Sequence, residues 1–527
     1  MRKFSSYGPV DTEMNYYAPR KELIEKTYLQ LTGENPKKGG HYFTVWAPRQ
    51  TGKTWVMQEV IEKIEQSGLF HTAIITLDRA KYEKDEKVIA SILIEKLQIA
   101  FSKQFPQFQK ISEISSLFTA SYFQKPIILL LDEFDALEEE WINRFAGIFR
   151  DMFISRTNER NKGSKEKYYL LHGLALIGVR SVLGIENQKG SPFNIQRSVH
   201  IPNLTFEEVD GMFKWYEQES GQKVEDTVIK TLFEETLGQP GLTCWFGELL
   251  TETYNHDINK PISISNYKEA YGAATHILPN NNILNLISKV NKPPYDEMVI
   301  GFFKTGEKIA FNFDNPGINY LYMNGVITDE KVSDDEYYLK FSCPFVQKRL
   351  FNYFSNRFFS YMGQLIHPLD AMEDAIDEEN LYIPNIIKRY QAYLTKNQGI
   401  FFKDVPRRKT DMRIYEAIYH FNLYRYLYDL LKSRGVDIIP HFPTGNGKID
   451  LILKYRGHVY ALELKSFKNM YLFEKGIDQA ADYGRQMGLT EVAFLVFVEL
   501  NPSEAKQLEK ETNKSGVKVT VLPIAIL

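Results

Sequence analysis

A short apolar run leading into Gly52-Lys53-Thr54 constrains this 527-residue chain more than any other feature. Tyr42–Ala47 has the composition of a buried strand, and a helical pattern begins at Lys53. Backbone N–H groups at a helix start can cradle phosphate. Lys53 is expected to reach the β- and γ-phosphates of a nucleotide, and the Thr54 hydroxyl is expected to bind Mg²⁺. The same loop is expected to hold the nucleotide through Ala47, Pro48, Arg49, Gln50, Thr51 and Gly52.

A second strand-like run, Ile127–Leu131, ends in Asp132-Glu133. A strand that is apolar on both faces belongs in the middle of a parallel sheet, and such sheets bind ligands at the carboxyl ends of their strands. We therefore expect Asp132 to hold Mg²⁺ and Glu133 to polarise the attacking water. Each element alone also fits a chance helix start or an ordinary acidic strand end. Their order in one α/β region favours a P-loop ATPase, although Ala47 stands where the usual pattern has Gly.

The fold class predicted from this patterning is α/β multidomain, with a parallel sheet near the amino terminus. Residues 315–324 are expected to form the third helix of a winged helix whose wing is a strand-turn-strand between 325 and 341. That helix carries no Arg or Lys between 318 and 323, which favours packing against the ATPase over DNA contact. The predicted divisions are an N-terminal segment at 1–40, a P-loop ATPase core at 41–205, a helical lid at 206–275, a winged helix at 276–355, a connector at 356–410 and a further α/β domain at 411–527.

Composition excludes several classes of protein. The 64 Lys and Arg against 67 Asp and Glu give a net charge of −3, so a nucleic acid partner must be held by local basic patches. Two such segments are Arg407-Arg408-Lys409 and Arg156 to Lys167, although each also fits a solvated loop. Two cysteines exclude a disulfide framework. Because no signal peptide and no membrane-spanning run is visible, we expect a cytoplasmic protein with no membrane partner.

A hairpin pattern near the carboxyl terminus carries a second candidate site. Two strand-like runs flank a tight turn at Arg456-Gly457, so that Tyr455 pairs with His458. In this register Asp450 lies directly across from Glu463, with Cβ atoms about 4.5–5.5 Å apart. Lys465 lies two residues beyond Glu463 and therefore points to the same face.

Two carboxylates placed opposite one another repel, and a divalent cation would reverse that repulsion. Mg²⁺ takes one or two carboxylates together with waters and substrate phosphate, so this pair is a candidate metal site. Lys465 beside the metal would position or help deprotonate the attacking water, or neutralise developing charge, which suits phosphodiester hydrolysis. Glu416 on an upstream helix is a candidate additional ligand. A hairpin with solvated charges is the alternative.

The amino-terminal half resembles P-loop ATPases of the AAA and STAND types over roughly residues 15–275. The resemblance rests on the phosphate loop, the Asp132-Glu133 strand, Arg180 at the sensor position and the Gly238-Gln239-Pro240 turn. It implies ATP and Mg²⁺ as cofactors, with Arg180 and Pro240 at the nucleotide. It also implies a nucleotide-driven conformational switch, which in that family often promotes oligomerisation, so a nucleotide-dependent homo-oligomer is expected.

Residues 411–500 resemble the PD-(D/E)XK nuclease superfamily, a restriction-endonuclease-like fold, in the order helix–strand–strand–helix–strand. Asp450 and Glu463-Leu464-Lys465 match its core motif, and a helix carrying Gln479 and Tyr483 resembles the RecB-like branch. The resemblance implies Asp450 and Glu463 as metal ligands and Lys465 in the hydrolytic role, with Glu416 as an auxiliary acid. The proline of the core motif is absent, because Lys448-Ile449 precedes Asp450.

Together these patterns predict a nucleotide-switched, Mg²⁺-dependent nuclease that acts on nucleic acid, with DNA favoured over RNA. Such a pairing would suit prokaryotic defence or mobile-element biology. The alternative, of another class, is a nucleotide-dependent signalling or scaffold protein whose nuclease-like domain is catalytically inactive. A DNA-translocating repair ATPase would need helicase motifs that the sequence does not show.

Overall fold

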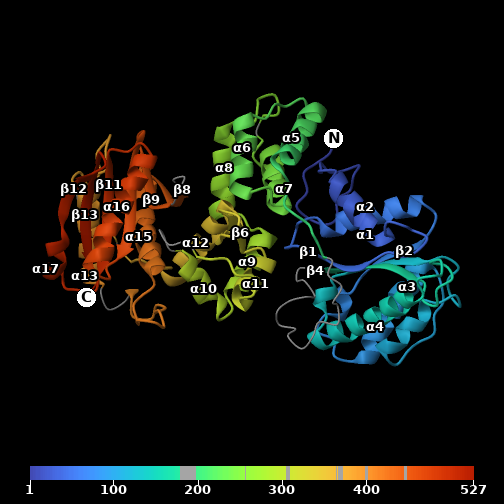
Figure 1. Cartoon of the computed structure of the whole chain (residues 1–527). Coiled ribbons are helices and arrows are strands. Elements are labelled where there is room, and N and C mark those ends of the chain that lie inside the picture. Colours follow the sequence, from blue (N-terminus) through green and yellow to red (C-terminus); the bar gives the residue numbers. More distant parts are fainter. Residues whose placement is uncertain are drawn as a thin grey trace. The chain divides into compact units, whose positions relative to one another are not determined.

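The computed structural model describes residues 1–526 apart from 179–197, 256, 304–308, 364, 366–371, 398–400 and 444–447. The chain divides into two compact units. The first is Met1–Lys289 with Phe311–Val346, and the second is Val290–Ala310 with Gln347–Leu527 (Figure 1).

A five-stranded parallel sheet with strand order β2-β3-β4-β1-β5 forms the centre of the first unit. The prediction of a parallel α/β sheet is thus confirmed. Because β4 lies between β1 and β3, the carboxyl ends of β1 and β3 reach the same edge of the sheet one strand apart. The strands are β1 (Tyr42–Trp46), β2 (His71–Thr76), β3 (Ile127–Asp132), β4 (Leu171–Gly178) and β5 (Ser198–His200).

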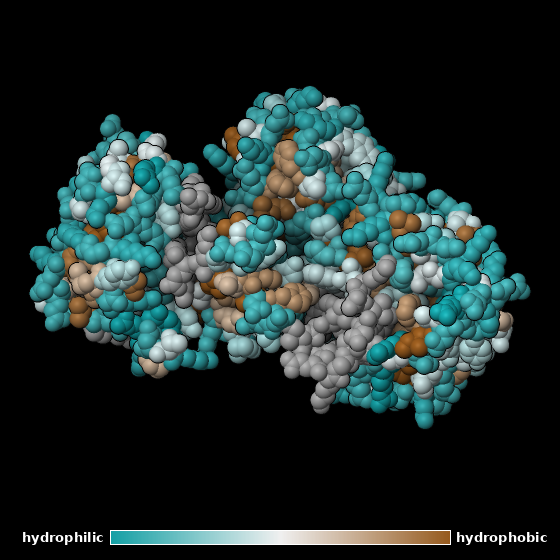
Figure 2. All heavy atoms as spheres, in the orientation of Figure 1, coloured by the Kyte–Doolittle hydropathy of each residue, from teal (hydrophilic) through white to brown (hydrophobic). Residues whose placement is uncertain are grey.

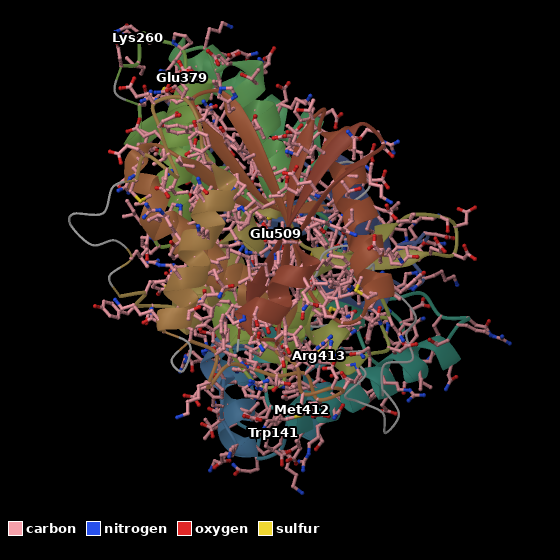
Figure 3. The ribbon with its side chains drawn as sticks, turned by 90° about the vertical axis from the view of Figure 1, so that its left-hand side faces the viewer. Trp141, Lys260, Glu379, Met412, Arg413 and Glu509 are labelled. Atoms are coloured by element: carbon pink, nitrogen blue, oxygen red, sulfur yellow. The ribbon has the colours of Figure 1, made fainter. Side chains whose placement is uncertain are left out.

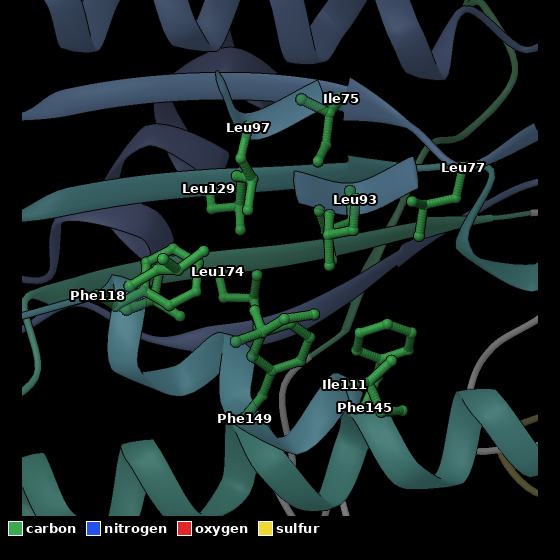
Figure 4. Packing of buried hydrophobic residues seen from close by; sticks show 14 of the residues in the cluster. Ile75, Leu77, Leu93, Leu97, Ile111, Phe118, Leu129, Phe145, Phe149 and Leu174 are labelled. Atoms are coloured by element: carbon green, nitrogen blue, oxygen red, sulfur yellow. The ribbon is translucent and has the colours of Figure 1, made fainter. Parts of the chain in front are cut away.

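Helices cover both faces of this sheet. Strand β3 is buried along its whole length, and its side chains alternate between two apolar clusters. Leu129 and Leu131 pack toward α3 and α4 in the cluster of Figure 4, whereas Ile128 and Leu130 pack toward α1 and α2. This two-sided burial explains why the run carries no polar residue before Asp132. The helices are α1 (Lys21–Thr32), α2 (Lys53–Gln66), α3 (Glu86–Phe101) and α4 (Glu139–Asn158).

The helical region predicted after residue 205 is also present. It contains α5 (Phe206–Ser220), α6 (Asp226–Thr236), α7 (Pro240–Glu248) and α8 (Ile264–His276). Beyond these lie α9 (Asn281–Val290), α11 (Pro316–Met323) and an antiparallel hairpin of β6 (Ile327–Lys331) and β7 (Tyr337–Phe341). The helix and hairpin expected between 315 and 341 are therefore found, while the winged-helix assignment stays a prediction.

The corner between α11 and β6 packs against the end of β1. The Tyr322 and Trp46 ring centroids are 5.7 Å apart. Gly325 has a φ of +78°, and a Cβ atom there would lie 2.8 Å from the Cβ of Pro48. Glycine is thus required at this position both by its backbone conformation and by the close approach. This contact agrees with the expected packing role of the region.

The second unit is built on a six-stranded mixed sheet with strand order β12-β13-β11-β10-β9-β8. Strands β10, β11 and β13 run parallel, and the other pairings are antiparallel. The strands are β8 (Asp437–Pro443), β9 (Lys448–Tyr455), β10 (His458–Ser466), β11 (Glu491–Val498), β12 (Lys510–Lys514) and β13 (Val517–Ala525). The helices are α10 (Tyr295–Phe302), most of α12 (Pro344–Phe358), α13 (Ile383–Lys396), α15 (Glu416–Leu431), α16 (Met470–Gln486) and α17 (Pro502–Ala505).

Two helices sandwich the middle of this sheet. Phe494 and Val496 of β11 pack against α16 in one apolar cluster. Phe497 points to the other face, where its ring stacks on Tyr419 of α15 at a centroid distance of 4.6 Å. The elements predicted for residues 411–500 are present, but the structure adds one strand that the prediction lacked, because β8 lies between α15 and β9.

The coloured residues on the face shown in Figure 2 are largely hydrophilic, with apolar side chains scattered among them. Among the described residues no helix combines the length and apolar character needed to cross a membrane.

The β9–β10 turn supplies a stability prediction. Arg456 and Gly457 have φ values of +48° and +87°, which is the left-handed conformation of a two-residue hairpin turn. Gly457→Ala should lower the free energy of unfolding by about 1–2 kcal/mol, because a Cβ is disfavoured in this region. Gly457→Asn should cost less, since Asn tolerates the conformation. Urea denaturation of both variants measures the difference, and equal stability of the Ala variant and the unsubstituted protein would contradict it.

Candidate functional sites

The loop between β1 and α2 wraps around the ammonium group of Lys53. Gln50 and Gly52 have φ values of +57° and +82°, so the backbone turns tightly before the helix. The Lys53 ammonium donates hydrogen bonds to the carbonyl oxygens of Ala47 at 2.9 Å and Pro48 at 2.8 Å. Burial lowers the pKa of Lys53 to about 8, although Asp135, Glu133 and Asp132 each raise it in part. The Lys53 ammonium therefore lies inside the loop and is held by two of its carbonyl oxygens. The oxygens of a bound phosphate group would be stronger hydrogen-bond acceptors for it than these carbonyl oxygens.

Asp132 at the end of β3 meets the start of α2. The Thr54 hydroxyl donates a 2.8 Å hydrogen bond to Asp132 Oδ2, although the two residues lie 78 positions apart in the sequence. Glu133 follows with a φ of +53°, a strained conformation for a residue with a side chain. Burial, and then Asp135 and Asp132, raise the pKa of Glu133. The structure thus brings together Lys53, Thr54, Asp132 and Glu133.

This donor set fits Mg²⁺ and a nucleotide. A hydroxyl and a carboxylate oxygen already lie within hydrogen-bond distance of each other, and both are oxygen ligands of the kind that Mg²⁺ prefers. The Lys53 ammonium and the N–H groups at the start of α2 supply positive charge for phosphate.

The turn at Gly238-Gln239-Pro240, which we call the lid turn, contacts the phosphate loop between β1 and α2. Gln239 Nε2 donates to the carbonyl oxygen of Arg49 at 3.1 Å, and the Gly241 N–H donates to that of Gln50 at 2.9 Å. Pro240 begins α7 and lines a cavity of about 60 Å³ together with Thr51 and Gly52. The turn at residues 238–240 therefore touches the loop as the sequence led us to expect, whereas Arg180 lies outside the described residues.

Sequence reasoning missed the N-terminal segment at this site. Tyr17 and Val10 line the same cavity, and the Tyr17 ring packs on Trp55 of α2 at 5.4 Å. Tyr16 is buried and its hydroxyl donates to Glu219 of α5 at 3.2 Å. The several tyrosines in residues 1–40 indicate that this segment packs against another part of the chain. The local sequence pattern does not indicate which part that is.

The β9–β10 hairpin has the register predicted from the sequence. His458 pairs with Tyr455, and Leu462 pairs with Leu451. Continuing that register by one pair places Asp450 opposite Glu463. Ile452 and Ala461 are the preceding pair on this face, and both pack in the apolar cluster formed with α16. The two carboxylates therefore lie directly beside a surface from which water is excluded.

Asp450 and Glu463 are almost entirely buried, at 1% and 0% exposure. The Leu464 N–H donates to Asp450 Oδ2 at 2.7 Å, whereas the Glu463 carboxylate is contacted by the ammonium group of Lys465. Burial, and then the neighbouring Asp450, raise the pKa of Glu463 well above its ordinary value. Two carboxylates in such a place are costly unless a cation compensates them.

Lys465 is the cation that the chain itself provides. Its ammonium lies 3.2 Å from Glu463 Oε1 and 3.8 Å from Glu416 Oε1. Burial alone would lower the pKa of Lys465, but Glu463, Glu416 and Asp450 together raise it above its ordinary value. Lys465 is therefore an ammonium group in this arrangement and not a base.

Glu416 at the start of α15 joins this group as predicted from its position. Its Oε2 accepts the Ser466 N–H at 3.0 Å. Burial raises the pKa of Glu416, but Lys465, His420 and the Ser466 N–H outweigh it and hold that pKa below the ordinary value. Glu416 is therefore ionised beside the ammonium of Lys465.

His420, one helical turn after Glu416, was not predicted. Its Nδ1 lies 3.5 Å from Asp450 Oδ1, and burial lowers the pKa of His420 to about 4. The imidazole is therefore neutral at pH 7, the form that can bind a metal ion. The spacing of four residues from Glu416 was the available signal.

Gln479 and Tyr483 of α16 lie on one helical face, and Gln479 Nε2 donates to the Tyr483 hydroxyl at 2.6 Å. Gln479 lines a cleft of about 110 Å³ that also contains Glu416 and Lys465. Tyr483 is mostly buried in the α16 cluster. Gln479 thus lines the cleft, and its hydrogen bond to the buried Tyr483 hydroxyl fixes the position of its amide group.

The chemistry of these donors fits Mg²⁺ as a two-carboxylate site. Within the parts of the chain that the structure describes, no three His, Cys, Asp or Glu side chains are arranged as a metal-binding group. Mg²⁺ needs only one or two carboxylates with water, and the buried carboxylates of Asp450 and Glu463 are such a pair.

Comparison with known proteins identifies the domain that contains the first of these sites. The model of a family described as an AAA-like domain matches residues 5–255, so this part of the chain is an AAA-like P-loop ATPase domain. No curated protein matches the chain.

Three solved structures illustrate what the chain is similar to in fold. The Walker-type ATPase PABY2304 of Pyrococcus abyssi is 14% identical with a TM-score of 0.44, covering 66% of this chain and 99% of its own. Cdc6p of Pyrobaculum aerophilum is 11% identical with a TM-score of 0.38, covering 66% and 95%. The RuvB Holliday junction branch migration motor of Thermotoga maritima is 12% identical with a TM-score of 0.32, covering 61% and 92%.

Lys53→Ala should weaken ATP binding at least about tenfold, because hydrogen bonds to charged groups contribute about 1.5–3 kcal/mol. Lys63→Ala is the matched control, since Lys63 lies on the same helix but pairs with Glu25 at the surface. Isothermal titration calorimetry measures both affinities. Unchanged ATP affinity of the Lys53 variant would reject the site.

Glu463→Gln should raise the melting temperature at pH 8 in EDTA, by about 2–4 °C for each kcal/mol of stabilisation. The folded pKa of Glu463 is raised, so its contribution to stability is present below the unfolded pKa and is lost as pH rises through the folded pKa. The gain over the unsubstituted protein should therefore shrink toward pH 4.

Mg²⁺ should raise the melting temperature of the unsubstituted protein at pH 8 but not that of the Glu463 variant, because binding to the folded state stabilises it. Thermal unfolding followed by circular dichroism, without nucleotide, measures both effects. Equal melting temperatures at every pH and Mg²⁺ concentration would show that Glu463 carries no buried charge.

Proposed function

We propose that this protein is an ATP-regulated, Mg²⁺-dependent nuclease that hydrolyses phosphodiester bonds, with DNA as its substrate. The observation that carries the proposal is the β9–β10 hairpin, which buries Asp450 and Glu463 side by side with Lys465 as their cation. Such a grouping costs folding free energy and is expected where it serves chemistry. The same grouping supports membership of residues 411–527 in the PD-(D/E)XK superfamily.

Each residue of the second site has a role that follows from its contacts. Asp450 and Glu463 would hold Mg²⁺, which supplies Lewis acidity and charge neutralisation when bound. Lys465 is protonated, so it orients the attacking water and stabilises the negative charge that develops on the phosphate. Glu416 accepts the Ser466 N–H and thereby fixes the end of β10 beside Lys465. Gln479 offers its amide group to the substrate from the cleft wall.

The ATPase domain would act as the regulator. Thr54 and Asp132 would hold Mg²⁺, Lys53 would bind the phosphates and Glu133 would polarise the attacking water. The nucleoside would lie against the N-terminal segment, Trp55 and Pro240, whose cavity of about 60 Å³ would have to widen to enclose it. Because the lid turn hydrogen-bonds to the phosphate loop, nucleotide binding would shift the lid and promote assembly of a homo-oligomer, as in STAND-type switches.

Cleavage of plasmid and linear DNA with Mg²⁺, with and without ATP, tests the proposal. Asp450→Asn and Lys465→Ala should each reduce the rate at least about 100-fold, the usual scale for loss of a catalytic group. Asp437→Asn is the control, because Asp437 is an exposed carboxylate of the same sheet. Lys53→Ala should remove the dependence on ATP.

Full cleavage by the Asp450 variant would reject the nuclease site. ATP binding without any Mg²⁺-dependent cleavage by the unsubstituted protein would favour a nucleotide-switched scaffold with an inactive nuclease-like domain.

A further inference from the structure

The cleft beside the hairpin has a basic rim. Its lining includes four cations, Arg408, Lys465, Lys468 and Lys475, and a single carboxylate, Glu416. Arg408 comes from the basic connector segment, more than 50 positions before Lys465 in the sequence. The adjacent Arg413, labelled in Figure 3, donates to the carbonyl oxygen of Phe467 at 3.0 Å and ties this segment to the end of β10. Arg408 pairs with Asp411 at 2.7 Å, and Lys465 pairs with Glu463 and Glu416. Lys468 and Lys475 are therefore the lining cations that make the rim attract anions, although the chain as a whole is slightly acidic.

An exposed apolar group stands at this rim, where α16 begins. Met470, Tyr471 and Leu472 are 52%, 76% and 40% exposed. The core contact of this turn is made instead by Phe473. Leu472 lines the cleft, and Tyr471 lies one helical turn from Lys475, which also lines it. An aromatic ring thus stands in solvent next to a phosphate-attracting surface.

We propose that Tyr471 stacks on an unpaired base of the nucleic acid, so that the substrate is a single strand or a frayed strand end. This inference rests on the proposed nuclease function and specifies its substrate. The cleft, at about 110 Å³, is well below the size of a ligand pocket that encloses a base-sized molecule, so it takes a phosphate group and leaves the bases outside. A base that lies outside the cleft, next to the bound phosphate, can then contact the exposed Tyr471 ring.

The charges agree with a strand running along the first turns of α16. Lys475 has no ion-pair partner among the residues that the structure describes and is free to contact a phosphate. Aromatic stacking beside cations is the usual means of holding single strands, because each unpaired base exposes a flat face. A base inside a duplex is already stacked on its neighbours, so a blunt duplex gains nothing from Tyr471.

Binding in EDTA tests this inference separately from cleavage. The probes are a fluorescently labelled single-stranded oligonucleotide, containing 2-aminopurine as a stacking reporter, and a blunt duplex of the same sequence. Tyr471→Ala of the full chain should weaken single-strand binding at least about fivefold, abolish the change in 2-aminopurine fluorescence and leave duplex binding unchanged. Tyr471→Phe should bind as the unsubstituted protein does. Tyr361→Ala, which removes a tyrosine that is 83% exposed in the same unit, is the matched control.

Lys475→Ala supplies an independent measurement. It should reduce the slope of log affinity against log salt by about 0.7 for the single strand, as expected for one lost phosphate contact. An unchanged slope would remove Lys475 from the proposed contact surface.

The outcomes separate the two proposals. If the unsubstituted protein cleaves DNA but Tyr471→Ala affects single strand and duplex equally, or neither, the stacking inference is wrong and the nuclease stands. If the unsubstituted protein neither binds nor cleaves nucleic acid, both fail. Binding of anionic lipid vesicles that is lost in Tyr471→Ala, without nucleic acid binding, would assign the surface to a membrane instead.

Discussion

The burial of Asp450 and Glu463 against one another is the interaction on which the account of the second unit depends. A hairpin could place these positions outward, where water would screen the charges. Instead the pair lies at the end of a cluster that α16 closes, with Lys465 as the compensating cation. Burial and the neighbouring Asp450 raise the pKa of Glu463 and Lys465 opposes that rise, while the carboxylates of Glu463, Glu416 and Asp450 raise the pKa of Lys465.

The two candidate sites use the same physical device in different sheets. In the first unit, Asp132 is the last residue of the fully buried strand β3 and accepts a hydrogen bond from Thr54 at the start of α2. In the second, Glu463 is the last fully buried residue on its face of β10, and Lys465 pairs with both Glu463 and Glu416. In both, apolar strand packing excludes water up to the first charged residue, so the charge can be compensated only by protein groups or by a bound ion.

Much of this could be predicted from the sequence, because the relevant signals are local. The strand before the phosphate loop, the apolar run before Asp132 and the two-residue turn at Arg456-Gly457 each fix their own geometry, and the turn also fixes the register that places Asp450 opposite Glu463. Three contacts could not be predicted from the sequence: that of His420 with Asp450, that of Tyr17 with Trp55, and the position of Arg408 in the lining of the cleft. Each depends on packing between segments far apart in the chain, which no local periodicity records.

The most direct test of the central claim is a crystal structure of the protein with Mn²⁺ and a non-hydrolysable ATP analogue, measured at the manganese absorption edge. The phosphate loop provides the internal control, since a peak beside Thr54 and Asp132 shows that the metal has entered the crystal. We predict a second peak within coordination distance of both the Asp450 and Glu463 carboxylates, with Lys465 turned away from Glu463. A peak at the phosphate loop alone, with Lys465 still paired to Glu463, would contradict the account.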